Sequence, residues 1–370
     1  MPIPAPITSA GLAAAVGLIL VGTAVPVRAA DALETMFKRF VAREQLPGAV
    51  LLVSGPSGRR VLTAGVADRK TRAPVVADTR FYVASVGKVP LAVMVLQQAG
   101  EGLYALEDKV APLVADLPRV EKVANLDRAS VAQLLNHTSG LPEYFTDAFE
   151  AAQAEMPDKV WSPASALRFA AGQPATGRVG TKYEYTNTNY MLLGHVVEQA
   201  DHGSLAESFQ RRIFERAGMG ESTVGAEASD PTLAHGYADP EDEGVLQDVS
   251  LAAWNSPLGD GALVTTAGDL ERFLFAAFRD GKLLLPALLK RMKAPTPLEP
   301  TYGFGLSLYE DANGHCLYHS GHVDGFNAEI AYYVEQQTAI VFMTNGEGAV
   351  SESVADEAVN KAAAIIIGGE

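Results

Sequence analysis

The sequence AVLLVSGPSGRRVLTAGV, residues 49–66, decides the fold. Apolar runs at 49–54 and 60–66 flank Gly-Pro-Ser-Gly at 55–58. Glycine and proline in this arrangement favour a tight turn, so the two runs are predicted to pair as a β-hairpin. An antiparallel sheet is therefore expected to begin close to the N-terminus, and more distant parts of the chain must complete it.

Strand patterns return near the C-terminus, where short apolar runs are found at 303–309, 316–321, 328–334 and 338–344. Helical spacing is found at 32–43, 86–100, 190–199 and 350–366. We therefore expect an α+β fold, in which one antiparallel sheet is built from both termini and flanked by helices, with a mostly helical domain inserted. The expected sheet domain comprises 31–90 and 260–370, and the expected insertion comprises 91–259.

The first 29 residues predict a secretory signal peptide. Residues 11–25 are almost wholly apolar, and Val27-Arg28-Ala29 fits the small-x-small pattern of a signal peptidase site. This run is too short to span a bilayer comfortably, so we expect a periplasmic or secreted protein, cleaved near Ala29, without a stable membrane span. The net charge of −15 argues against a nucleic-acid partner, because phosphate binding needs a basic face. The lone Cys316 cannot form an internal disulfide and is expected to be a buried strand residue.

The segment Ser85-Val86-Gly87-Lys88 is the first candidate for catalysis. It stands where an extended segment meets a predicted helix, and a spacing of three residues puts Lys88 beside Ser85 on one face. A serine hydroxyl becomes nucleophilic when a neighbouring base takes its proton, and a helix N-terminus favours the negative charge that develops. The spacing alone is also typical of a capping serine beside an unrelated lysine. Pro90 removes a helix N–H unless the helix starts late.

Two further segments offer the partners that a reactive serine needs. Tyr-Thr-Asn at 185–187 lies in a polar loop ahead of an apolar helix; Tyr185 can shuttle a proton, and Asn187 can hold the lysine or a substrate amide. His-Ser-Gly at 319–321 ends a predicted strand, where glycine lets a substrate backbone approach and His319 can supply a donor or a partial charge. Taken singly, both segments also fit structural roles such as ring packing, helix capping or a hydrogen-bonded histidine.

Together, Ser-x-x-Lys at 85, Tyr-x-Asn at 185 and His-Ser-Gly at 319 resemble the three boxes of the penicillin-recognising serine hydrolases. That family comprises class C β-lactamases, D-Ala-D-Ala carboxypeptidases and β-lactamase-like esterases. The resemblance covers nearly the whole chain after the signal, because the surrounding stretches are also similar: LPGAV at 46–50, DTRF at 78–81, LEDKV at 106–110, HTSGLP at 137–142 and GALVTT at 261–266. It implies a β-lactamase/transpeptidase-like fold and a serine hydrolase that works through an acyl-enzyme.

The resemblance assigns roles to the residues of the three boxes. Ser85 attacks the substrate carbonyl, Lys88 and Tyr185 share the proton transfers, with the identity of the base left open, and Asn187 orients Lys88 or the substrate amide. His319 takes the place that lysine holds in the β-lactamases. Histidine there fits the carboxypeptidase and esterase branches better than the lactamase branch.

The resemblance also implies an oxyanion hole made by the backbone N–H groups of Ser85 and His322. The substrate pocket is expected to draw on loop and strand residues, namely Tyr144, Trp254, Asn255, Tyr302, Ser320, Gly321 and Phe326. We expect no cofactor and no metal, because His315 and His319 share a strand face that His322 does not, and no His-Glu-x-x-His helix is present.

The expected substrates are small esters and D-amino-acid peptides or amides. A β-lactamase, or a non-catalytic penicillin-binding receptor on the same fold, is kept as the alternative. An α/β-hydrolase would need Gly-x-Ser-x-Gly after a strand, and no serine of this chain has those neighbours. The expected partner is a small-molecule or peptide substrate, and the sequence leaves the oligomeric state open.

Overall fold

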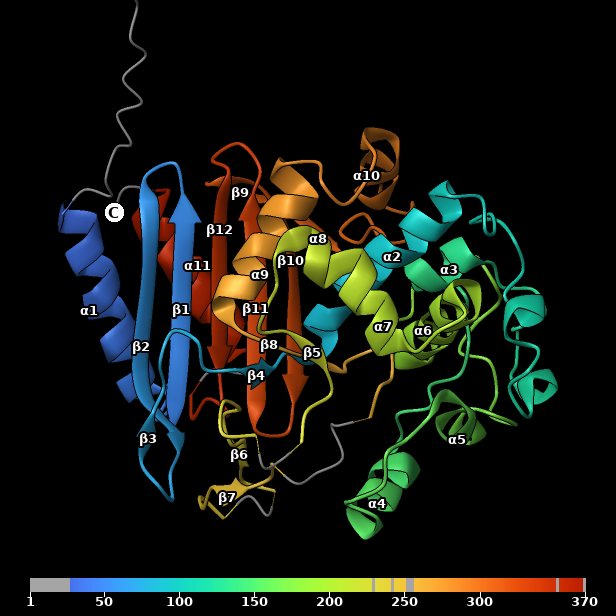
Figure 1. Ribbon diagram of the computed structural model, residues 1–370, viewed down its shortest axis with the longest axis horizontal. Helices are drawn as coiled ribbons and strands as arrows, with labels where there is room; N and C mark the ends of the chain where they lie inside the picture. The colour runs from blue at the N-terminus through green and yellow to red at the C-terminus, as the bar shows by residue number, and fades with distance from the viewer. Residues whose placement is uncertain (1–26, 228–229, 241–242, 251–255, 351–352, 369–370) are drawn as a thin grey trace, which may run out of the picture.

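A seven-stranded antiparallel sheet lies at the centre of the computed structural model, which describes residues 27–227, 230–240, 243–250, 256–350 and 353–368 (Figure 1). The strand order is β3-β2-β1-β12-β11-β10-β9. These strands are β1 (Gly48–Gly55), β2 (Gly58–Asp68), β3 (Ala73–Pro74), β9 (Ser307–Asp311), β10 (Gly314–Val323), β11 (Phe326–Tyr333) and β12 (Thr338–Thr344).

Most helices follow one another in the middle of the chain. The α-helices are α1 (Val27–Arg43), α2 (Lys88–Gly100), α3 (Val131–Leu135), α4 (Asp147–Glu155), α5 (Pro163–Ala166), α6 (Asn187–Asp201), α7 (Leu205–Phe209), α8 (Glu215–Ala217), α9 (Ala267–Leu274), α10 (Pro286–Met292) and α11 (Val354–Ile366). Short 3₁₀ turns are Ala84–Gly87, Ala111–Val114, Val120–Lys122 and Leu167–Phe169, and π-helical turns are Gln210–Phe214 and Phe275–Arg279.

The two ends of the chain meet in the sheet, as the sequence predicts. The hairpin of β1 and β2 closes at the pair Gly55 and Gly58. Gly58 has a φ of +121°, a conformation that side-chain-bearing residues rarely adopt. β1 then pairs with β12, so that Ala49 lies opposite Thr344. The predicted fold class is confirmed.

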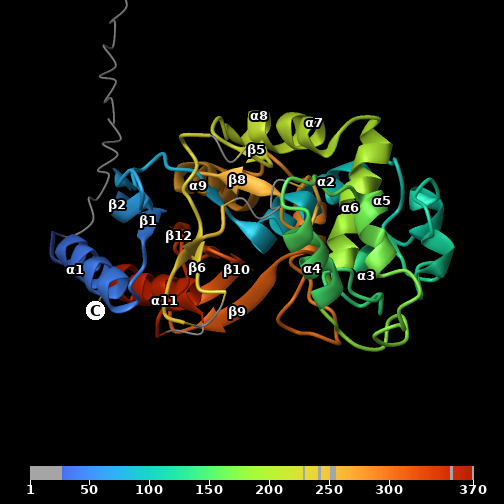
Figure 2. The same cartoon turned by 90° about the horizontal axis from the view of Figure 1, so that it is seen from below.

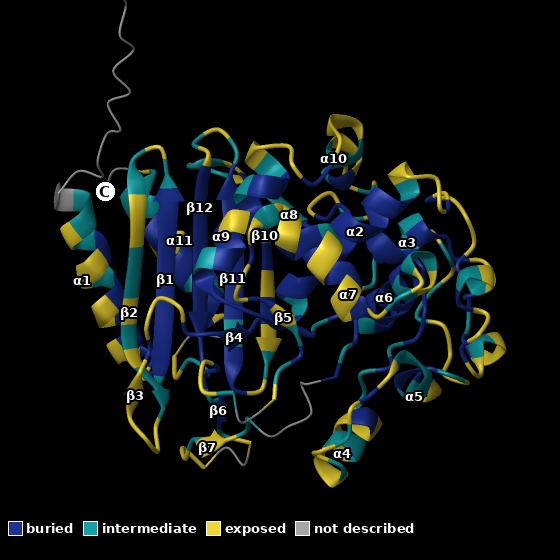
Figure 3. Ribbon diagram, in the orientation of Figure 1, coloured by how far each residue is buried: buried dark blue, intermediate teal, exposed yellow. Residues whose placement is uncertain are grey.

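The sheet has a hydrophobic core on each face. In β12, Ile340 and Phe342 point toward α1 and α11, whereas Val341 and Met343 point to the opposite face, where α9 packs. Successive side chains of a strand alternate between faces, so a strand covered on both sides reads as one apolar run. Figure 2 shows α1 and α11 together on one side of the sheet and α9 on the other. The strands β1, β11 and β12 are buried along almost their whole length, whereas β2 and β10 each have exposed residues (Figure 3).

The middle of the chain contains more strand than the sequence predicts. β5 (Thr223–Val224), β6 (Tyr237–Ala238) and β7 (Gln247–Asp248) fall within the segment expected to be mostly helical. β5 joins β4 (Phe81–Tyr82) and β8 (Leu263–Thr265) in a small sheet of its own. Strands this short have no room for a recognisable alternation, so their sequences carry no strand signal.

The N-terminal signal prediction falls largely on residues 1–26, which lie outside the described part of the chain. Within the described residues, no helix is both long and apolar enough to cross a membrane.

Candidate active site

Ser85 lies in a 3₁₀ turn, Ala84–Gly87, and α2 begins only after it, at Lys88. The helix therefore starts two residues later than the predicted residue 86, and Pro90 lies in its first turn. The N–H groups of the first turn have no partner within the helix, so a proline is tolerated there. Ala84, directly before the serine, has a φ of +45°. Left-handed backbone at a residue with a side chain is strained, and such strain tends to be held at functional sites.

Lys88 is fully buried, and its amine has three close neighbours. Its Nζ lies 2.8 Å from Ser85 Oγ, 2.9 Å from Asn187 Oδ1 and 2.7 Å from the backbone oxygen of Asp260. The last two atoms can only accept hydrogen bonds, so they take two N–H groups of the lysine. The third position on Nζ faces Ser85 Oγ, and it holds a proton in the ammonium form or a lone pair in the amine form. The geometry therefore suits both directions of proton transfer between Ser85 and Lys88.

Tyr185 and Asn187 reach Ser85 and Lys88 from the start of α6. The ring of Tyr185 lies 5.1 Å from Lys88 Nζ, close enough for a cation–π contact, and its side chain is partly open to solvent. The backbone N–H of Asn187 donates to Glu143 Oε2 at 2.6 Å. Glu143 thus caps the first turn of α6 and fixes the residue that holds Lys88. Burial raises the pKa of Glu143.

His319 lies on β10 and faces the helices rather than solvent. Its Nε2 is 3.2 Å from the Tyr302 hydroxyl, and its Nδ1 is 2.6 Å from the backbone oxygen of Ser320. Burial and then the charge of Lys88 lower the pKa of His319 to about 4, so the ring is neutral near pH 7. Desolvation thus disfavours a full positive charge on the imidazole at neutral pH, and the expectation that His319 supplies a donor or a partial charge beside Tyr185 stays a prediction.

β10 makes close backbone contact with the turn that carries Ser85. A Cβ atom at Gly321 would lie 2.1 Å from the backbone oxygen of Val83 and 2.9 Å from the Ser85 nitrogen. Glycine is therefore needed for the strand to approach the turn. His322 lines both cavities that open on Ser85, and its side chain is 60% exposed and lies 3.7 Å from Glu347. The oxyanion hole of Ser85 and His322 stays a prediction.

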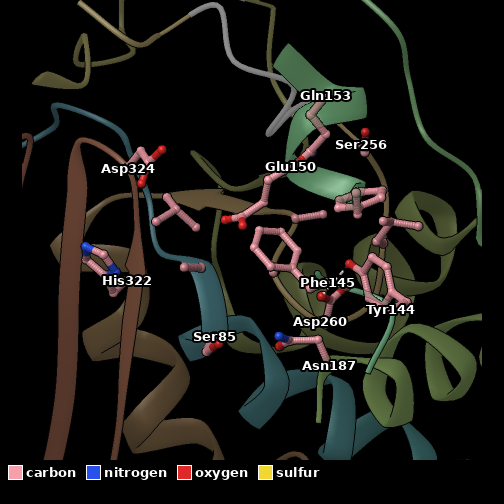
Figure 4. Close-up of a pocket in the computed structure, with 16 residues that line it drawn as sticks. Ser85, Tyr144, Phe145, Glu150, Gln153, Asn187, Ser256, Asp260, His322 and Asp324 are labelled. Atoms are coloured by element: carbon pink, nitrogen blue, oxygen red, sulfur yellow. Dashed lines mark hydrogen bonds between the residues drawn. The ribbon is translucent and has the colours of Figure 1, made fainter. Parts of the chain in front are cut away.

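Two cavities open on Ser85. The first, of about 210 Å³, lies between the serine and α4 (Figure 4). Its walls include Phe145 and Phe149, and its polar lining includes the carboxylates of Glu150, Asp260 and Asp324. The second cavity lies along β10 and is lined mainly by tyrosine rings and strand residues, namely Tyr183, Tyr185, Tyr302, Ser307, Tyr318, His319, Ser320, Gly321 and His322.

The predicted pocket residues are only partly brought together. Tyr144 lines the first cavity, where its hydroxyl donates to Asp260 Oδ2 at 2.7 Å, and Tyr302, Ser320 and Gly321 line the second. Phe326 lines neither of these cavities. It is buried against the ring of Tyr82, with ring centroids 5.5 Å apart, so its placement in the pocket is corrected. Trp254 and Asn255 lie outside the described residues.

Sequence reasoning missed four residues around the serine: His137, Glu143, Glu150 and Asp260. His137 belongs to the HTSGLP stretch, and Asp260 precedes GALVTT, so the familial stretches were the available signal. His137 is fully buried under the ring of Tyr185, with centroids 4.2 Å apart. Burial, then the charges of Lys88 and His319, lower the pKa of His137. In the described part of the chain, no group of three or more His, Cys, Asp or Glu side chains is arranged to hold a metal ion.

Comparison with known sequences places this site in a family. The family model of the β-lactamases matches residues 33–364. D-aminopeptidase of Brucella anthropi is 28% identical over 332 residues, which are 87% of this chain and 60% of that protein. Penicillin-binding protein 4* of Bacillus subtilis is 26% identical over 361 residues, 91% of this chain and 76% of that one. The chain thus spans only about 60% of the D-aminopeptidase length.

Solved structures share the fold. D-amino acid amidase of Ochrobactrum anthropi SV3, complexed with D-phenylalanine, superposes with a TM-score of 0.80 at 24% identity and covers 93% of this chain and all of that one. An octameric penicillin-binding protein homologue from Pyrococcus abyssi gives a TM-score of 0.78 at 23% identity, covering 92% of this chain and 77% of that one. The sheet, the three boxes and the match over 33–364 lead to one conclusion: the chain belongs to the β-lactamase family.

Proposed function

We propose that this protein hydrolyses an ester or amide bond through an acyl-enzyme on Ser85. The observation that carries the proposal is the contact between Lys88 Nζ and Ser85 Oγ, 2.8 Å long, beside two cavities. The hydroxyl proton passes to the Lys88–Tyr185 pair as Oγ attacks the carbonyl carbon. The same pair returns a proton to the leaving group, and water then attacks the acyl-serine and regenerates the hydroxyl.

The charges around Ser85 favour a substrate whose acyl part is cationic and whose leaving group is uncharged. The residues that line the two cavities include no lysine or arginine in the described chain, and the neutral His319 occupies the strand position where β-lactamases have lysine. A leaving group with a carboxylate therefore meets no lysine or arginine among the described residues of these two linings. A D-Ala-D-Ala carboxypeptidase and a β-lactamase both act on substrates that carry such a carboxylate. The charges around Ser85 therefore rank the carboxypeptidase activity that His319 suggests in the sequence below the hydrolysis of amides and esters with uncharged leaving groups.

The first cavity, in contrast, is acidic. Glu150 directs its carboxylate into the cavity from α4, Asp324 stands on the opposite side, and burial and the charge of Asp324 raise the pKa of Glu150 (Figure 4). Asp260 is more than nine-tenths buried, and its Oδ1 has no hydrogen-bond partner among the described residues. These groups suit the α-ammonium of an amino acid. Similarity to D-aminopeptidase and D-amino acid amidase supports D-amino-acid amides and N-terminal D-residues as the substrates, with small esters cleaved by the same chemistry.

A substrate panel tests this proposal. We expect hydrolysis of D-alanine amide and of D-alanine nitrophenyl ester, with N-acetylated forms of both cleaved several-fold less efficiently, because they lack the cation. Glu150→Gln combined with Asp324→Asn should remove most of that preference, whereas Asp147→Asn, on the same helix but outside the cavity lining, should keep it. Ser85→Ala should be folded and inactive. A preference for D-Ala-D-Ala would contradict the expected choice of an uncharged leaving group. A preference for a cephalosporin would favour a β-lactamase, and a permanent penicillin adduct would favour a non-catalytic receptor.

We also propose that the protein is exported, to the periplasm or beyond the cell, after cleavage near Ala29. The apolar segment at 11–25 and the small residues around Ala29 support this proposal. Expression of the full chain with fractionation and N-terminal sequencing tests it. A mature protein that begins at Ala30 or close to it is expected, and an unprocessed cytoplasmic chain would contradict it.

A further inference from the structure

A chain of buried hydrogen bonds runs from the helical region to the catalytic strand. Asn189 Nδ2 lies 3.1 Å from His137 Nδ1, and His137 Nε2 lies 3.4 Å from the Tyr302 hydroxyl. The same hydroxyl lies 3.2 Å from His319 Nε2, and His319 Nδ1 lies 2.6 Å from the backbone oxygen of Ser320. Asn189, His137, Tyr302 and His319 are all buried. None of the proposed catalytic steps uses His137, Tyr302 or Asn189.

The protonation of His137 follows from its neighbours. The backbone N–H of Thr186, which can only donate, points at Nδ1 from 3.3 Å. The amide of Asn189 also donates to Nδ1, because its oxygen accepts from the hydroxyl of Ser139 at 2.7 Å. Nδ1 therefore carries the lone pair of the ring. A neutral His137 must hold its proton on Nε2 and donate it to the Tyr302 oxygen.

The protonation of His319 follows in the same way from its other end. The backbone oxygen of Ser320 can only accept, so Nδ1 of His319 holds the proton. Nε2 of the neutral ring then carries a lone pair, and the Tyr302 hydroxyl donates to it. Tyr302 accepts from one imidazole and donates to the other. Each bond of the chain thus points the same way, from Asn189 to Ser320, and each donor has an acceptor.

We propose that His137 and Tyr302 are positioning residues that keep His319 as the neutral Nδ1–H tautomer, so that this position on β10 offers a leaving group no positive charge. This series of hydrogen bonds is complete only while His319 Nε2 accepts a hydrogen bond from the Tyr302 hydroxyl. A proton on Nε2 would point at that hydroxyl, and the Tyr302 proton would lose its acceptor. Neutral His319 presents no positive charge to a leaving group at its position on β10. The effect on the choice of leaving group rests on the proposed acyl-serine function, whereas the tautomer of His319 does not depend on it.

The groups that surround His319 come from four parts of the fold. Lys88 lies on α2, Tyr185 precedes α6, His137 follows α3 and Tyr302 precedes β9. Lys88 opposes a positive charge on His319, and burial raises the pKa of the Tyr302 phenol, which therefore stays protonated near neutral pH. Loss of the Tyr302 hydroxyl removes the donor to Nε2 and leaves this lone pair free to take a proton. His319 should then become easier to protonate.

The variant Tyr302→Phe, with Tyr183→Phe as the matched control, tests the inference. Tyr183 lines the same cavity and contacts the Tyr302 ring, with centroids 5.5 Å apart, but its hydroxyl bonds to none of the chain members. In Tyr302→Phe, the acid limb of kcat/KM for an uncharged leaving group should move up by about one pH unit. At pH values below the shifted acid limb, His319 is cationic, and the activity on D-Ala-D-Ala relative to that on D-alanine amide should rise. His137→Asn, which tolerates the φ of +56° at this position, should shift the limb in the same direction.

Nitrogen NMR of the unmodified protein tests the tautomer without any turnover. With ¹⁵N-histidine labelling and assignment by His319→Gln, His319 should show a protonated Nδ1 and an unprotonated Nε2 near pH 7, and His137 the reverse. The opposite tautomers, or a limb that shifts equally in Tyr302→Phe and Tyr183→Phe, would overturn the inference. If no substrate is turned over, the proposed function fails while the tautomers can still be read.

Discussion

Replacement of His319 by glutamine should remove a defined part of the protein's sensitivity to acid. The folded chain holds the pKa of His319 at about 4, because the ring is buried and lies beside Lys88. In the unfolded chain, histidine titrates near pH ~6.5. Between these two values, the unfolded state binds more protons than the folded state. Stability from this residue is therefore present above about pH 6.5 and is lost as the pH falls toward about 4.

The size of the loss follows from the difference between the two pKa values. A gap of about 2.5 units corresponds to about 3 kcal/mol when it is fully expressed, with about 2 kcal/mol lost between pH ~7 and pH ~5. The variant lacks the titrating group, so its free energy of unfolding should fall by that much less over the same interval. Any constant difference at pH ~7, from altered packing or hydrogen bonding, cancels in this comparison.

Urea titrations of both proteins across this pH range measure the effect. His315→Gln is a suitable control, because His315 is exposed and its pKa is raised by a hydrogen bond to Glu335. Stability from His315 is present at low pH and is lost as the pH rises, so this variant should change the curve in the opposite direction. Parallel stability curves for the wild type and His319→Gln would refute a buried, neutral His319.

Two further substitutions probe the surroundings of Ser85. Lys88→Met keeps the volume of the side chain but removes the amine. Because residues that act as a unit with the nucleophile are needed together, kcat should fall by about 10⁴-fold, which steady-state kinetics with a nitrophenyl ester measure. Near-normal turnover would exclude Lys88 from proton transfer. Gly321→Ala places a Cβ 2.1 Å from the Val83 backbone oxygen, so it should push β10 from the serine turn and lower both activity and melting temperature. Gly220→Ala, with no atom within 4 Å of its Cβ, should change neither, and equal effects of the two substitutions would contradict the close contact.

The sheet could be predicted from the sequence because its strands have strong local signals. The hairpin at 49–66 combines two apolar runs with a Gly-Pro-Ser-Gly turn, and β12 is a continuous apolar run because both of its faces are covered. The late start of α2 was not predicted, although Pro90 pointed to it, because a 3₁₀ turn and the first turn of a helix have similar sequences. The two-residue strands β5 to β7 were missed because no periodicity can develop over two residues.

The three boxes identified the groups at Ser85 because each box is local in sequence. Other groups depend on distant contacts: the backbone oxygen that holds Lys88 belongs to Asp260, 172 residues away, and a backbone atom leaves no trace in residue identity. The neutral state of His319 depends on its burial and on Tyr302, neither of which a motif reports. Phe326 lies on the sheet face toward the site, but Tyr82 covers it, and this packing could not be foreseen.

The most direct test of the central claim is to trap the acyl-enzyme and find the residue that carries it. The protein is mixed with D-alanine nitrophenyl ester, quenched in acid within the first turnover and digested for mass spectrometry. The mass of one alanyl group is expected on Ser85, and Ser85→Ala is expected to carry none and to release no nitrophenol above the buffer rate. An adduct on any other side chain, or turnover that continues without Ser85, would contradict an acyl-serine hydrolase.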